Sequence, residues 1–85
     1  MNPSFNGLYL FDLKGDSEYF IVNANDNVIL LFDNDNEIRL FGVKRGNGYS
    51  IYDYKNQQYQ SYFSSDGQKG FNQFDLNGKW IGYVK

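Results

Sequence analysis

An aromatic residue followed by aspartate recurs four times along the 85-residue chain, and this repeat limits the fold more than any other feature. The four aspartates are Asp12, Asp33, Asp53 and Asp75, spaced 21, 20 and 22 residues apart. In each copy an apolar segment precedes the aspartate, a polar turn follows it, and a second apolar segment ends the copy. A period of this length indicates a repeated unit of supersecondary structure.

The second copy shows this unit most clearly. Residues 28–32 are apolar and rich in β-branched and aromatic types, which is typical of a strand, and both faces of that strand are apolar. Asp33–Asn36 favours a turn, because Asp and Asn accept backbone hydrogen bonds and tolerate left-handed backbone angles. The chain returns through 38–43. A helix is the competing interpretation, but both apolar segments are too short for one. We predict a β-hairpin whose first strand is covered on both sides.

The other three copies predict hairpins of the same kind. Their strands are expected at 8–12 and 18–22, 49–53 and 59–63, and 71–75 and 79–84. Asn77-Gly78 favours a type I′ turn, which needs positive φ at both central residues. Polar connections at 23–27, 44–48 and 64–68 join the copies. The chain is therefore predicted to be one all-β domain, residues 1–85. It is an antiparallel meander of about eight short strands, curled into a small barrel or a strongly twisted sheet, since closure removes unpaired edges.

Two stretches resemble known families of tandem hairpins. Residues 71–79 resemble the tyrosine–aspartate repeat of large bacterial shell proteins, and residues 61–83, with Asp66-Gly67 and Asn77-Gly78, are similar to MORN-type repeats and the antitoxin-like proteins built from them. Each resemblance covers about a quarter of the chain. Of the first two copies, only the first has the turn glycine, at Gly15. The resemblance implies stacked hairpins and carries no function over.

Two absent residue types restrict the chemistry. The chain has no His and no Cys, which removes the commonest general base, thiol catalysis and the usual zinc ligands. Asp33–Glu37 alternates oxygen-bearing side chains like a calcium loop, but it lacks the glycine and the bidentate glutamate of such a loop. Each repeated aspartate is expected to cap its turn, the alternative being a line of ligand-binding carboxylates. We expect no enzyme, no catalytic residue, no cofactor and no metal site.

Targeting signals do not appear in the sequence. The N-terminal residues lack a basic segment followed by an apolar core, so no secretory signal is predicted. No apolar run approaches the roughly 20 residues of a membrane helix. Without cysteines, nothing ties the chain to an oxidising compartment. The expected location is the cytoplasm, with no membrane partner.

Charge is distributed unevenly along the chain. Residues 1–43 hold seven acidic and two basic side chains, and residues 44–85 hold three acidic and six basic ones, which gives −5 and +3. Solvated turns explain this simply. The alternative is a polarised surface that steers a charged partner, with Asp33, Asp35 and Glu37 facing a basic channel.

Five of the eight tyrosines fall within fourteen residues. Strand alternation points Tyr49 with Ile51 and points Tyr52 and Tyr54 the opposite way, so some of these rings are expected to be exposed. Tyrosine is enriched at binding surfaces, although an aromatic core or an AT-rich genome would also explain the cluster. The candidate partner-binding residues are Tyr49, Tyr52, Tyr54, Tyr59, Tyr62, Asp33, Asp35 and Glu37.

Three functions fit these observations. The leading hypothesis is a non-enzymatic protein-binding module, such as a small inhibitor, antitoxin or immunity-type factor from a bacterium or phage, with a protein as its partner. The second is a carbohydrate-binding domain, because flat aromatic faces and polar Asn, Asp and Gln side chains suit sugars. The third is a single-stranded nucleic-acid binder, which the net charge of −2 disfavours. Self-association through an open sheet edge or face is a further expectation.

Overall fold

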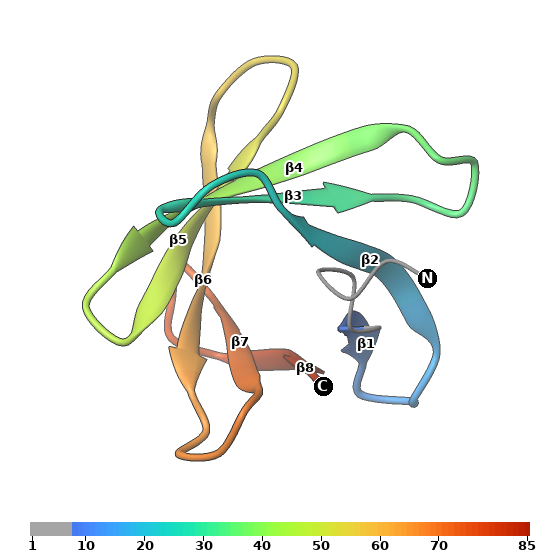
Figure 1. Cartoon of the computed structure of the whole chain (residues 1–85). Helices are drawn as coiled ribbons and strands as arrows, with labels where there is room; N and C mark the ends of the chain where they lie inside the picture. Colours follow the sequence, from blue (N-terminus) through green and yellow to red (C-terminus); the bar gives the residue numbers. More distant parts are fainter. Residues whose placement is uncertain (1–7) are drawn as a thin grey trace.

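A closed barrel of eight antiparallel strands makes up the protein (Figure 1). The computed structural model describes residues 8–85 and contains no helix in that range. The strands are β1 (Tyr9–Asp12), β2 (Ser17–Asn23), β3 (Val28–Phe32), β4 (Ile38–Arg45), β5 (Gly48–Asp53), β6 (Tyr59–Ser65), β7 (Phe71–Asp75) and β8 (Trp80–Val84). Each strand pairs with the next, and β8 pairs with β1. The predicted meander is confirmed, and of its two forms the barrel is the one observed.

The fourfold repeat of the sequence is also a repeat of the backbone. In the first strand of every copy the pairing register shifts just before the aromatic residue of the motif. The four shifts fall at Leu10/Phe11, Leu31/Phe32, Ile51/Tyr52 and Gln73/Phe74. Such an irregularity bends a strand and increases its twist. Four of them at equivalent positions curl the meander until its ends meet.

The repeated aspartates cap the hairpin turns. Asp12 Oδ1 accepts hydrogen bonds from the backbone N–H groups of Lys14, at 2.9 Å, and Asp16, at 3.0 Å. The other three aspartates each accept two backbone N–H groups in the same way. One residue per turn has positive φ: Gly15, Asn36, Gln57 and Gly78. The type I′ turn predicted at Asn77-Gly78 is wrong, because only Gly78 has positive φ. The turns instead suit three-residue loops closed by one left-handed residue, with an extra residue in the third copy.

Side chains fill the interior of the barrel. Its buried hydrophobic residues are Leu10, Ile21, Ile29, Leu31, Leu40, Ile51, Phe63 and Val84. Gly42 makes room among them, since a Cβ there would lie 2.7 Å from Ile29 and 2.9 Å from Ile51. One polar pair is buried, in which Gln73 Nε2 donates to Ser61 Oγ at 3.0 Å. Within residues 8–85 the interior is thus a packed core.

Stacked aromatic pairs cover the seams between copies on the outside of the barrel. Each pair joins the second strand of one copy to the first strand of the next, with ring centroids 5.1–5.4 Å apart. The pairs are Phe20–Phe32, Phe41–Tyr52, Tyr62–Phe74 and Tyr83–Phe11. Offset stacking of this kind adds to the stabilisation from burial. The stack of Phe20 on Phe32 also covers part of the outer face of β3. The apolar residues on both faces of this strand predict such a cover.

Candidate binding surface

The two ends of the barrel differ in charge. Because consecutive strands are antiparallel, all four hairpin turns lie at one end, the turn end. The three connections between copies and both ends of the described chain lie at the other, the loop end. The turn end holds Asp12, Asp16, Glu18, Asp33, Asp35, Glu37, Asp53 and Asp75 against Lys14, Arg39, Lys55 and Lys79, a balance of −4. The loop end holds Asp26 and Asp66 against Lys44, Arg45, Lys69 and Lys85, a balance of +2. The uneven charge along the sequence therefore becomes a difference in charge between the two ends of the barrel.

Exposed hydrophobic side chains gather at the acidic end. Within residues 8–85, six large hydrophobic side chains are exposed, and five of them belong to the turn end. We call these five the apolar rim: Leu13, Tyr54, Tyr59, Leu76 and Trp80. Three directly follow a repeated aspartate, and two open the second strand of a hairpin. Trp80, the only tryptophan, is 50% exposed. Exposed apolar groups concentrated in one region indicate an interaction surface.

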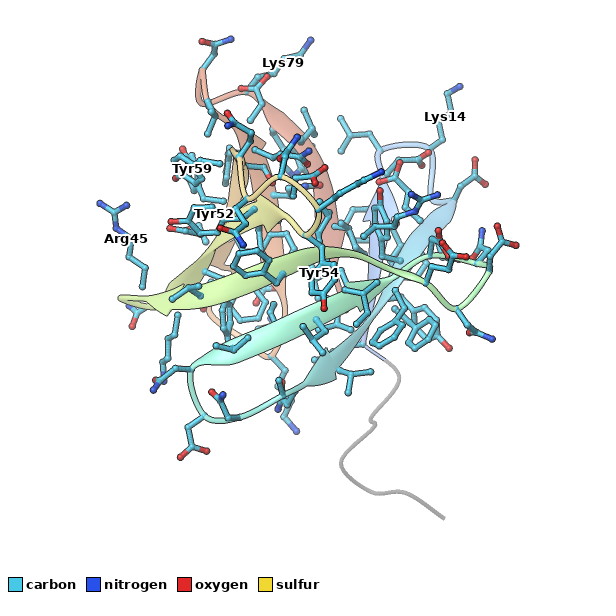
Figure 2. The ribbon with its side chains drawn as sticks, turned by 90° about the horizontal axis from the view of Figure 1, so that it is seen from above. Lys14, Arg45, Tyr52, Tyr54, Tyr59 and Lys79 are labelled. Carbon is cyan, nitrogen blue, oxygen red and sulfur yellow. The ribbon has the colours of Figure 1, made fainter. Side chains whose placement is uncertain are left out.

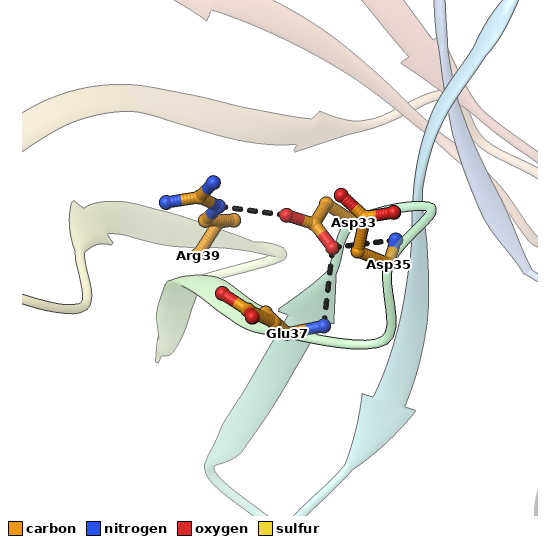
Figure 3. Close-up of polar contacts among 4 residues, drawn as sticks. All are labelled: Asp33, Asp35, Glu37 and Arg39. Carbon is orange, nitrogen blue, oxygen red and sulfur yellow. Dashed lines mark hydrogen bonds and ion pairs between the residues drawn. The ribbon is translucent and has the colours of Figure 1, made fainter.

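Within the acidic trio of the second turn, Asp33 has a structural role (Figure 3). Its Oδ2 accepts a hydrogen bond from Arg39 Nε at 2.7 Å, and its Oδ1 accepts from the backbone N–H groups of Asp35 and Glu37. The hydrogen bond from Arg39, joined by that from the Glu37 backbone, lowers the pKa of Asp33 below its ordinary value. Asp35 and Glu37 are exposed at the tip of the same turn. They are the two members of the trio that a partner can reach.

Two open hollows flank this second turn. The first, of about 470 Å³, is lined by Glu18, Tyr19, Asp33, Asn34, Asp35, Arg39 and Asp53. The second, of about 550 Å³, is lined by Glu37, Ile38, Arg39, Asp53, Tyr54, Lys55 and Asn56. They share Arg39 and Asp53, so they adjoin each other, and the depression they make extends from the start of β2 to the third turn. Its surroundings are mostly acidic, and Tyr54 stands at its edge.

Tyr19 is the aromatic residue on the wall of the first hollow. Burial raises the pKa of its phenol, and the neighbouring Glu18 carboxylate raises it further. Burial also raises the pKa of Glu18, with a smaller contribution from Asp12. The phenol therefore stays protonated near neutral pH, where it can donate a hydrogen bond.

The structure separates the five clustered tyrosines. Tyr52 stacks on Phe41, and its ring centroid lies 5.4 Å from that of Tyr59 on the outside of the barrel (Figure 2). Tyr54 meets the edge of the Phe41 ring. Tyr62 stacks on Phe74 at a different seam. Tyr49 packs against the core and contacts Phe71 at 5.6 Å, pointing inward with Ile51 as expected.

Five of the eight predicted site residues therefore lie at the turn end: Asp33, Asp35, Glu37, Tyr54 and Tyr59. Sequence reasoning missed Leu13, Leu76 and Trp80. A signal for two of them was present, because leucine directly follows the repeated aspartate in the first and fourth copies, where a turn favours polar residues.

Residues 8–85 contain no group of three acidic side chains placed to hold a metal ion. They also include no helix of the length and apolarity needed to cross a membrane. Comparisons of the chain with protein-family models, curated proteins and solved structures found no match. The surface itself is therefore the basis for assigning a function.

Proposed function

We propose that this protein is a non-enzymatic protein-binding module, of the class of small inhibitors, antitoxins or immunity factors of bacteria and phages, and that its turn end docks on a basic protein surface. One observation carries the proposal. The end of the barrel with a charge of −4 is also the end with five of the six large hydrophobic side chains that are exposed within residues 8–85.

Apolar anchors and acidic surroundings have different roles in such a surface. Tyrosine and tryptophan supply most of the affinity in protein interfaces when a partner covers them, and Tyr54, Tyr59 and Trp80 are exposed to do so. An acidic field around them accelerates the approach of a basic partner and disfavours acidic ones. The closed barrel holds the turns on a hydrogen-bonded frame, which limits the ordering cost of binding.

The residue content supports a binding role over catalysis. The chain contains no His and no Cys, so an enzyme would depend on carboxylates, lysines, tyrosines and hydroxyl groups. The four repeated aspartates are engaged by backbone N–H groups of their own turns. Carboxylates held in this way stabilise turns and are poorly placed for proton transfer.

The test is a pull-down from native bacterial lysate with the immobilised protein, repeated after nuclease treatment and at raised salt. The double variant Tyr54→Ser/Trp80→Ser removes two anchors, and Asp35→Asn/Glu37→Gln removes two charges. We expect one stoichiometric protein, resistant to nuclease, that the first variant loses and the second holds more weakly. Val43→Ser is the matched control, since Val43 is the exposed large hydrophobic residue outside the turn end.

Two results would contradict the proposal. The first is the absence of any stoichiometric protein. The second is a partner that both double variants retain as well as the unaltered protein does, because that partner would bind elsewhere.

A further inference from the structure

A groove of about 370 Å³ is formed by β5, β6 and the end of β4, and its lining includes Tyr59 of the apolar rim and Arg45 of the loop end. It is lined by Arg45, Asn47, Gly48, Tyr49, Ser50, Tyr59, Tyr62, Phe63 and Ser64. Ser50 pairs with Val43 on one side and Tyr62 on the other, so a small residue lies between two larger ones. The equivalent positions in the other copies hold Tyr9, Leu30 and Asn72. The third copy is thus hollowed where the others carry larger side chains.

Two tyrosine rings stand along this groove in supported positions. Tyr62 stacks on Phe74, with ring planes inclined by 20°. The Tyr59 ring lies 5.4 Å from that of Tyr52. Neighbouring rings restrict their rotation, so these rings offer preformed flat surfaces to a ligand.

The charged group of the groove is a cation without a partner. Arg45 is the charged residue of its lining, and no residue in the range 8–85 forms an ion pair with it. An adjoining hollow of about 340 Å³ shares Asn47, Gly48 and Tyr49 with the groove and is edged by Lys44 and Lys69. Neither lining includes a carboxylate. A lining of this kind, with cations and no carboxylate, suits a negatively charged ligand.

We propose that this groove binds an acidic saccharide, with sugar rings against Tyr59 and Tyr62 and a carboxylate on Arg45. Asn47, Ser50 and Ser64 place amide and hydroxyl groups around the same space, where they suit sugar hydroxyls. A nucleic acid would also combine flat rings with negative charge. The net charge of −2 and the single cation in the groove favour the sparser charge of a sugar acid over a polyphosphate. The proposal does not rest on the function proposed for the turn end, although Tyr59 belongs to both surfaces.

Calorimetric titration with a tetrasaccharide of galacturonic acid, beside the neutral tetrasaccharide of galactose, tests this site. Arg45→Gln removes the cation, and Ser50→Leu fills the groove with the residue found at the equivalent position of the second copy. Lys14→Gln removes a cation at the opposite end of the barrel (Figure 2) and is the matched control. We expect affinity for the acidic sugar to fall about tenfold or more in Arg45→Gln, by the usual strength of a charged hydrogen bond, and to change less than about twofold in Lys14→Gln.

Several results would overturn the proposal: no binding of the acidic tetrasaccharide at millimolar concentration, equal binding of the neutral sugar, or unchanged binding by Arg45→Gln. Tighter binding of oligothymidylate, in competition with the sugar, would assign the groove to nucleic acid instead. Ser50→Leu changes a side chain that is only 4% exposed, so its melting temperature is measured first. Arg45 is exposed, and its variant decides the question if Ser50→Leu fails to fold.

Discussion

The ring of Tyr83 in β8 stacks on the ring of Phe11 in β1, with centroids 5.3 Å apart and planes inclined by 15°. This contact joins the last strand to the first. Its geometry matches that of Phe20 and Phe32 at the seam between β2 and β3, where the values are 5.1 Å and 10°. The barrel therefore closes with the same aromatic contact that joins its successive hairpins.

A double-mutant cycle at the closing seam follows from this equivalence. With Phe11→Leu and Tyr83→Leu, urea denaturation is expected to give a coupling free energy of about 0.5–1.5 kcal/mol, the range for stacked aromatic pairs. Phe20→Leu and Phe32→Leu form the matched cycle and are expected to couple by a similar amount. A coupling near zero at the closing seam alone would mean that the first and last strands are not held by this stack.

The buried pair of Ser61 and Gln73 makes a second prediction. Ser61→Ala leaves the Gln73 amide inside the barrel without its acceptor, which is expected to cost about 1–3 kcal/mol of unfolding free energy. Replacing both, as Ser61→Ala/Gln73→Leu, is expected to recover part of this loss because neither position then holds a buried polar group without a partner. Urea denaturation of the three proteins measures it. A double variant less stable than Ser61→Ala would show that the shape of Gln73 matters more than its hydrogen bond.

Gln57 occupies a strained position in the third turn. Its φ is 63°, where the first and fourth turns place Gly15 and Gly78. Gln57→Gly is expected to stabilise the protein by up to about 1 kcal/mol, because the left-handed backbone disfavours a side chain more than glycine costs in the unfolded chain. Asn36→Gly, at a φ of 64°, is expected to change stability less, since asparagine tolerates this conformation. Thermal melting of both variants checks that Gln57→Gly raises the melting temperature more than Asn36→Gly does.

The ion pair of Asp33 and Arg39 predicts a dependence on pH. The pKa of Asp33 lies below its ordinary value of 3.8, so its ionised form is favoured by folding. The stability that this shift contributes is present above pH 3.8 and is lost as pH falls through the lower pKa of the folded state. Arg39→Gln removes the chief cause of the shift. The unfolding free energy of Arg39→Gln is therefore expected to be lower than that of the parent protein near pH 7. In acid the two values are expected to converge.

Denaturation curves between pH 2 and pH 7 measure this difference. Lys55→Gln is the control, because Lys55 also lies at the turn end but is not among the main causes of the lowered pKa of Asp33. A gap between parent and Arg39→Gln that stays constant down to pH 2 would show that Arg39 acts through packing of its side chain rather than its charge.

The hairpins could be predicted because their signals are local. Alternating apolar residues and a turn-capping aspartate lie within a few positions of each other, so each strand was predicted within two residues of its observed bounds. Closure could not be predicted in the same way. The contact of Phe11 with Tyr83 spans almost the whole described chain, and no local pattern distinguishes it from an open, twisted sheet. The prediction of a type I′ turn at Asn77-Gly78 was wrong because the register shift before Phe74 lengthens the loop by one residue.

The candidate surface was only partly predictable for a related reason. Asp35, Glu37 and Tyr54 were singled out by charge and residue type, but their meeting at one end depends on the alternation of all eight strands. The same alternation brings Leu13 and Trp80 to that end from distant parts of the sequence. Tyr49 shows the opposite case. It is a tyrosine like the others, but the alternation of side chains along β5 turns it toward the core.

The pairing of β1 with β8 has a consequence for how this chain can be rearranged. Tyr9 and Lys85 exchange backbone hydrogen bonds, so the two ends of the described chain lie side by side. The four seams carry the same kind of aromatic stack, and the connection at 24–27 is exposed. A circular permutant that links the present ends and begins inside that connection would keep every hairpin turn intact. The order of the hairpins along the chain is then one of four orders that would give the same ring of hairpins.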